Sequence, residues 1–94
     1  MFAAATLLMK DPELSRQHRP AHLAYLAALK AEGKVWANGP FGDGAGGLVI
    51  YRAPSLEEAR ALAEADPLVR TGARSLSLHA WEIALPVGAL DEGA

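Results

Sequence analysis

The most informative stretch of this chain is HRPAHLAYLAALKAEG, residues 18–33. Its leucines recur at the spacing of one buried helical face; they are Leu23, Leu26 and Leu29. We expect a helix with Pro20 in its first turn, where the amide hydrogen that proline lacks would have no partner. Gly33 is expected to close the helix as its C-terminal cap. Titratable groups crowd the first turn, which is unusual for a helix that only packs.

Four segments with the composition of strands surround this helix. They cover about residues 2–9, 34–41, 48–53 and 74–85, and a glycine-rich turn, GDGAGG at 42–47, joins the second to the third. A second helix is expected to start at Ser55, which has capping-box spacing to Glu58, and to end near Ala65. The order βαββαβ predicts an α+β, ferredoxin-like sandwich, a four-stranded antiparallel sheet with two helices on one face.

The composition excludes several classes of protein. The chain has 94 residues, enough for one domain, and 51% of them are hydrophobic, well above a disordered segment. A net charge of −2 and a pI of about 5.8 argue against a nucleic-acid partner. The absence of cysteine excludes disulfides, thiolate zinc sites and thiol nucleophiles. Neither a signal peptide nor an apolar run of membrane-spanning length is recognisable, so we expect no membrane association and a cytoplasmic protein.

The second face of the predicted sheet would be bare. Its candidate residues are Ala3, Ala5, Val49, Tyr51 and Trp81, a set too apolar for open solvent. An apolar patch of this size usually marks a partner, and a symmetric homodimer that joins sheet to sheet is the simplest one. Ser75, Ser77 and His79 on the last strand would point into the space between the sheets, where they contact a ligand or one another.

The predicted topology gathers titratable residues at one end of the domain. They are His18, Arg19, His22, Asp43, Asp66 and Arg74. His22 shares a helix face with Leu26 and Leu29, and the positive end of the helix dipole would favour its neutral form, which suits a general base. A half-buried histidine bonded to a carbonyl accounts for the same pattern.

Asp66 fits two local structures. At the carboxyl end of the second helix, a carboxylate is unfavourable by about 0.3–1 kcal/mol and would need a donor, such as the imidazole of His22. Alternatively, Asp66 caps a short helical turn that has Pro67 at its first position and Gly72 as its stop. A capping aspartate can also hold an imidazole.

A metal site or a phosphate loop would need further signals. His18 and His22 have the spacing of two metal ligands on one helix, with Asp66 or Asp43 as a third, but the accompanying signature of known zinc helices is missing. GDGAGG lacks the lysine and the hydroxyl of a phosphate loop. We therefore expect no metal and no cofactor.

Three stretches together resemble the YciI-like (YCII-related) family. They are RPAHLAYLAALKAEG, the pair Gly39-Pro40, and SLEEARALAEADPLVRTG. The resemblance covers about residues 1–85 and leaves 86–94 as a C-terminal tail. It implies a ferredoxin-like fold that pairs as a dimeric α+β barrel, with His22 and Asp66 as the active-site pair. Relatives of this barrel class catalyse lactone isomerisation, dehalogenating elimination or cofactor-free oxygenation of small cyclic substrates. The segment after Gly39-Pro40 is short for the family, which implies a different pocket lid.

These features predict a cofactor-free lyase or isomerase that acts on a small cyclic or acidic molecule. His22 would be its general base or acid, oriented by Asp66. The expected substrate-binding residues are Arg19, His18, Gly39, Pro40, Ser77 and His79, with Arg19 holding an anionic group. A non-catalytic small-metabolite binding module and a purely structural dimer are the alternatives.

Overall fold

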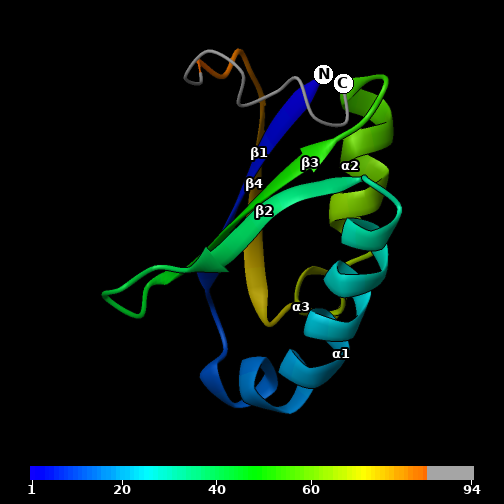
Figure 1. The fold of residues 1–94 in the computed structure, drawn as a ribbon. Helices are drawn as coiled ribbons and strands as arrows, with labels where there is room; N and C mark the ends of the chain where they lie inside the picture. Colours follow the sequence, from blue (N-terminus) through cyan, green and yellow to red (C-terminus); the bar gives the residue numbers. More distant parts are fainter. Residues whose placement is uncertain (85–94) are drawn as a thin grey trace.

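A four-stranded antiparallel sheet carries helices on one of its faces in the computed structural model, which describes residues 1–84 (Figure 1). The strands are β1 (Phe2–Met9), β2 (Val35–Pro40), β3 (Gly46–Arg52) and β4 (Arg74–Trp81), in the order β2-β3-β1-β4. The helices are α1 (Pro12–Ala31), α2 (Leu56–Glu64) and the short α3 (Pro67–Arg70). The predicted ferredoxin-like α+β fold is confirmed, and α3 is one additional turn before β4. The expected domain boundary at residue 85 and the tail at 86–94 lie outside the described residues.

Helix α1 begins at Pro12 and not near Pro20, so the sequence prediction of its start was wrong. The Asp11 side chain caps it by accepting hydrogen bonds of 3.1 Å from the backbone N–H groups of Glu13 and Leu14. Pro20 therefore lies inside the helix, where it cannot donate to the carbonyl four residues earlier. The helix changes direction in its first half, as expected for an interior proline (Figure 1). At its other end, Gly33 follows the cap residue with φ +77°, as expected.

The core lies between the sheet and the helices. Strand β1 places Ala3 and Ala5 on the covered face, where they pair with Tyr51 and Val49 of β3 and are almost inaccessible to solvent. These four residues were expected on the bare face, and that prediction was wrong; Trp81 does lie on the bare face. On α1 the inward stripe consists of His22, Tyr25, Leu26 and Leu29, whereas Leu23 is 44% exposed, contrary to expectation.

The uncovered face of the sheet carries aromatic and aliphatic side chains. Phe2 meets Trp36 edge to face, with ring centroids 5.9 Å apart. Trp36 and Trp81 are about two-fifths exposed. Because side chains alternate along a strand, Leu48 and Ile50 also belong to this face. Two aromatic rings of this size are thus left partly uncovered. None of the described helices is long and apolar enough to cross a membrane.

Candidate functional site

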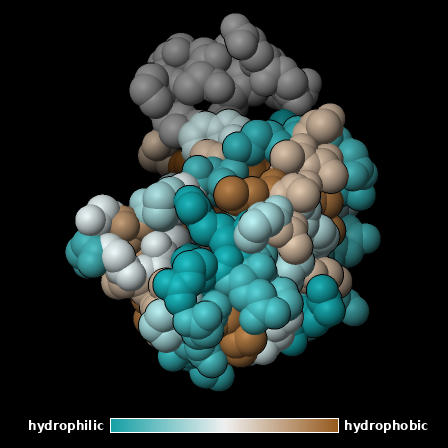
Figure 2. Space-filling model, turned by 90° about the horizontal axis from the view of Figure 1, so that it is seen from below, coloured by the Kyte–Doolittle hydropathy of each residue, from teal (hydrophilic) through white to brown (hydrophobic). Residues whose placement is uncertain are grey.

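A pocket opens at the end of the domain where β1 ends, β3 and β4 begin, and the first half of α1 passes. Its walls include Arg19, His22, Asn38, Gly39, Pro40 and Arg74. The space that it encloses is small, about 40 Å³. The surface at this end of the molecule is mostly hydrophilic, with small hydrophobic patches between polar groups (Figure 2). Of the six titratable residues predicted to gather at this end, Arg19, His22 and Arg74 line the pocket.

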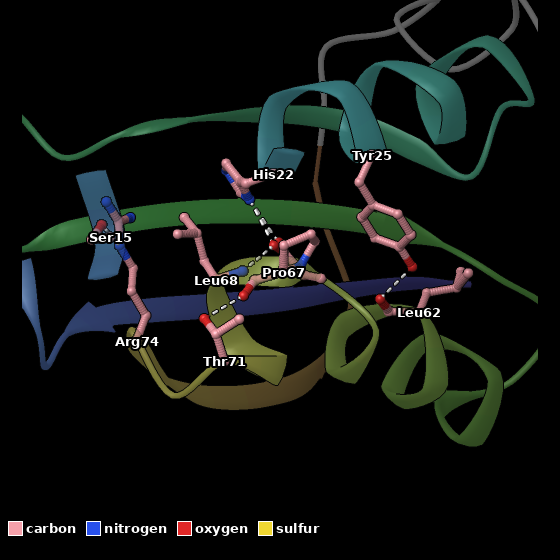
Figure 3. A network of polar contacts seen from close by, with 9 residues as sticks. Ser15, His22, Tyr25, Leu62, Pro67, Leu68, Thr71 and Arg74 are labelled. Carbon is pink, nitrogen blue, oxygen red and sulfur yellow. Dashed lines mark hydrogen bonds and ion pairs between the residues drawn. The ribbon is translucent and has the colours of Figure 1, made fainter. Parts of the chain in front are cut away.

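His22 and Asp66 form the most buried polar contact of this region. Nδ1 of His22 lies 2.8 Å from each carboxylate oxygen of Asp66. Asp66 is fully buried and His22 is 8% exposed. The dashed lines in Figure 3 lead from His22 to the start of α3. A carboxylate only accepts hydrogen bonds, so Nδ1 carries the proton. In the neutral imidazole, the second ring nitrogen, Nε2, is an acceptor, and His22 lines the pocket.

Asp66 also caps α3, so the two structures that its sequence allowed occur together. Its Oδ1 accepts a hydrogen bond of 2.9 Å from the backbone N–H of Leu68, and Pro67 occupies the first helical position. The Thr71 hydroxyl donates to the Pro67 carbonyl at the other end of the same turn. Asp66 directly follows Ala65, the cap residue of α2, so it lies at the carboxyl end of that helix. His22 and the backbone N–H of Leu68 supply the donors that a carboxylate in this position was expected to need.

The expected effect of the helix dipole on His22 is absent. The dipole acts within the first turn of a helix. Because α1 begins at Pro12, His22 lies far beyond that turn. The group that acts on His22 most directly is the carboxylate of Asp66, which contacts Nδ1.

Two guanidinium groups line the pocket beside His22. Arg74 Nε donates a hydrogen bond of 3.2 Å to the hydroxyl of Ser15, which is almost completely buried (Figure 3). Burial lowers the pKa of Arg74, the neighbouring charge of Arg19 lowers it further, and Asp66 acts in the opposite direction. The two arginines are thus close enough to repel each other. Arg74 was placed in the predicted cluster but missing from the predicted binding residues.

Gly47 lies next to Arg74 and close to the backbone of β2. A Cβ on Gly47 would lie 3.5 Å from Nη1 of Arg74 and only 2.9 Å from the carbonyl oxygen of Gly39. The adjacent Gly46 has φ +148°, and a Cβ there would fall 1.9 Å from the carbonyl oxygen of Leu7. Both glycines therefore allow the start of β3 to close against its neighbours.

Two tyrosines border Asp66 from the core side. The Tyr25 hydroxyl donates to the Leu62 carbonyl at 2.7 Å. Burial raises the pKa of Tyr25, and the charge of Asp66 raises it further. Burial also raises the pKa of Tyr51, with Asp66 and then Tyr25 adding to the shift. The Tyr51 hydroxyl is buried without a hydrogen-bond partner. Both side chains stay neutral at physiological pH.

The remaining predicted site residues divide into two groups. Gly39 and Pro40 line the pocket, as expected. His18 is half-buried on α1 without lining it, and the exposed Asp43 caps its own turn by accepting from the backbone N–H of Ala45. The hydroxyl of Ser77 and Nε2 of His79 are 3.2 Å apart. Their parity along β4 puts them on the uncovered face, opposite to the pocket.

Metal ligation was a second use considered for the histidines. Among residues 1–84, no three histidine, aspartate or glutamate side chains are grouped as a metal ion would require. Nδ1 of His22 is already engaged by Asp66.

Comparison with known proteins identifies a family and similar proteins. The family model of the YCII-related domain matches residues 2–82. The uncharacterized protein YjpA of Bacillus subtilis is 35% identical over 83 residues, which is 88% of this chain and 98% of YjpA. The 5-chloro-2-hydroxyhydroquinone dehydrochlorinase TftG of Burkholderia phenoliruptrix AC1100, solved in complex with 2,5-dihydroxybenzoquinone, is 26% identical. Its structure aligns with a TM-score of 0.74 over 89% of this chain and 96% of TftG.

Proposed function

This chain belongs to the YCII-related family, and we propose that it is an enzyme that removes a proton from a small anionic ring compound with loss of a leaving group. His22 is the proposed general base and Asp66 the residue that orients it. The observation that carries this proposal is the contact of His22 Nδ1 with both oxygens of the buried Asp66. It holds Nε2 as a proton acceptor on the side of the ring that is free to meet a ligand.

The similarity to a dehydrochlorinase supports elimination over isomerisation. In such a step, Nε2 of His22 takes a proton from the substrate. From a halogenated hydroxybenzene this step starts in the keto tautomer, in which one ring hydroxyl has passed its proton to the carbon that bears the halogen. The electron pair of the broken O–H bond of a second hydroxyl forms a carbonyl, the ring double bond shifts towards the halogen-bearing carbon, and the halide leaves with the electrons of its bond to carbon. The proton then passes from His22 to water. Only a proton and a halide depart, so the step needs no redox partner.

Substrate binding is proposed for the pocket walls. Arg19 supplies a positive charge for an anionic group, and Gly39-Pro40 forms the opposite edge. His18 does not line this pocket, so a role in binding would require a ligand that extends along α1.

A homodimer through the uncovered sheet face is part of the same proposal. Trp36 and Trp81 are apolar, partly exposed and on this face, which supports burial against a second copy. Ser77 and His79 would then face the space between two sheets. Sedimentation of wild type and Trp81→Glu tests it: a dimer that dissociates in the variant is expected, and a wild-type monomer at micromolar concentration would contradict it.

The test of catalysis is chloride release from 5-chloro-2-hydroxyhydroquinone and other halogenated hydroxybenzenes. Wild type is expected to release chloride, and His22→Asn to do so about 10²–10⁴-fold more slowly, the usual contribution of a general base. Circular dichroism and sedimentation would show that the variant keeps its fold and assembly. Equal rates for the two proteins would overturn the proposal.

A non-catalytic binding module is the second candidate. The capping of α3 by Asp66 favours it, because a buried carboxylate in that position needs a donor even in a protein without activity. In that case a ligand binds unchanged and His22→Asn affects stability alone. The chloride assay separates the two candidates.

A further inference from the structure

One acceptor beside the pocket lacks a hydrogen-bond donor. Oδ1 of Asn38 is buried without a partner, although the residue lines the pocket. Asn38 pairs with Val49 in the β2–β3 ladder, so its side chain shares the helix-covered face with the pocket. Buried acceptors in native proteins are normally bonded, and an exception calls for an explanation. A hydroxyl group of a ligand would supply the missing donor once the Asn38 side chain turns its amide towards the pocket that the residue lines.

The two arginines require the opposite kind of group. Ser15 holds Arg74 from one side, and Gly47 lies next to its guanidinium. Arg19 lines the same pocket, close enough for the two positive charges to repel. Five N–H donors in a planar fork suit an oxyanion, and an anion between the two groups would relieve their repulsion.

The size of the pocket limits how much of a ligand can enter. It encloses about 40 Å³. A cavity that takes up a whole benzene molecule measures roughly 150 Å³. Only one edge of a ring therefore fits, and that edge has to satisfy the arginines and Asn38 together.

We propose that the pocket selects ring compounds in which an oxyanion stands next to a hydroxyl group. Arg19 and Arg74 bind the oxyanion, and Oδ1 of Asn38 accepts the hydrogen bond of the neighbouring hydroxyl. This inference specifies the substrate class of the proposed enzyme and rests on the same pocket. It concerns binding, however, and does not depend on proton transfer to His22.

Three coloured phenols form a matched set of probes. 4-Nitrocatechol carries both groups, 2-methoxy-4-nitrophenol has the hydroxyl blocked by a methyl group, and 4-nitrophenol lacks it. The nitro group makes all three ionise near neutral pH, and their visible absorbance reports binding. Wild type is expected to bind 4-nitrocatechol about threefold to tenfold more tightly than either of the others, the effect of one neutral hydrogen bond.

Variants separate the binding of the hydroxyl group from the binding of the oxyanion. Asn38→Leu is expected to abolish the preference for 4-nitrocatechol while it leaves the affinity for 4-nitrophenol unchanged; Asn38→Ala serves the same purpose if the leucine variant does not fold. Arg74→Gln should weaken all three probes by about tenfold to a hundredfold, as for a lost charged hydrogen bond, and keep their ratio.

The proposal is overturned if wild type binds none of the probes at millimolar concentration, or if the preference survives in both Asn38 variants. The preference in wild type and its loss in those variants would support it, whether or not the enzyme releases chloride. Chloride release that depends on His22 without any preference among the probes would overturn this inference and leave the proposed catalysis in place.

Discussion

Asp11-Pro12 and Asp66-Pro67 begin helices α1 and α3 in the same way. In each pair the aspartate side chain accepts from the backbone of the first turn, from two N–H groups at Asp11 and from one at Asp66, and the proline occupies the first helical position. The helices differ in length, with 20 residues in α1 and 4 in α3. The surroundings differ more, because Asp11 is partly exposed while Asp66 has no exposed surface.

Only the buried aspartate has a hydrogen-bond partner outside its own turn. Oδ1 of Asp11 accepts from two backbone groups within its own turn. Asp66 accepts from Leu68 and also from His22, which is 44 positions away in the chain. A local motif of two residues can thus specify a helix start. The chemistry at Asp66 arises from burial and from the arrival of a distant imidazole, neither of which the motif contains.

The largest expected contrast between the two aspartates is in turnover. Asparagine caps helices as well as aspartate does, so both Asp66→Asn and Asp11→Asn should keep their helices. At position 66, however, the amide N–H₂ can donate to Nδ1 of His22 and stabilise the tautomer whose Nε2 is protonated and cannot act as a base. We expect chloride release to fall by about 10²–10⁴-fold in Asp66→Asn, as for loss of the general base.

Asp11→Asn is the matched control for this measurement, with the same chemical change in the same motif at a partly exposed site. Its kcat should equal that of wild type. If both variants turned over at the wild-type rate, the orientation of His22 by a carboxylate would play no part in catalysis.

The same contrast explains which parts of the molecule the sequence could predict. The order of strands and helices along the chain, the cap at Asp66 and the glycine after the end of α1 follow from patterns of adjacent residues. The start of α1 could not be predicted in this way. Ser15 is the only buried residue between Pro12 and Ala21, so this part of the helix shows no hydrophobic periodicity.

The sequence also could not predict which face of the sheet the helices cover. FAAATLLM has apolar residues at both parities, and a shift of one residue exchanges the two faces. The pairing of His22 with Asp66 followed from topology together with the family resemblance. The proposed roles of Asn38 and Arg74 rest on the burial of one atom and on which side chains line the pocket, and no spacing in the sequence indicates either.

A smaller contrast is expected in stability. Asp11→Ala removes a cap from a partly exposed site and should lower the free energy of unfolding by about 1 kcal/mol. Asp66→Ala removes a cap and also leaves Nδ1 of the buried His22 without its acceptor, so a loss of about 2–4 kcal/mol is expected. Urea unfolding of the two variants and wild type measures the difference, and equal losses would show that the contact with His22 contributes nothing to the fold.

The smallest contrast concerns the titration of Tyr25. Its pKa is raised first by burial and then by the charge of Asp66. In Asp66→Asn the pKa of Tyr25 should fall towards its ordinary value but stay above it, because burial remains. Asp11→Asn should leave it unchanged. A Tyr51→Phe background leaves Tyr25 as the single tyrosine, and the ultraviolet absorbance of tyrosinate follows it; an unchanged titration in Asp66→Asn would place the cause of the shift elsewhere.

The sign of the accompanying stability change follows from proton linkage. A raised folded-state pKa means that folded Tyr25 keeps its proton where the unfolded chain, with a pKa of about 10, has released it. The resulting stabilisation is complete below that pH and is lost as the pH rises through the folded-state pKa. Asp66→Asn reduces the difference between the folded-state and unfolded-state pKa of Tyr25. The free energy of unfolding of this variant should therefore decline less in alkali than that of wild type. A steeper decline in the variant would contradict the electrostatic coupling between Asp66 and Tyr25, and with it the difference between a buried and an exposed aspartate at the head of a helix.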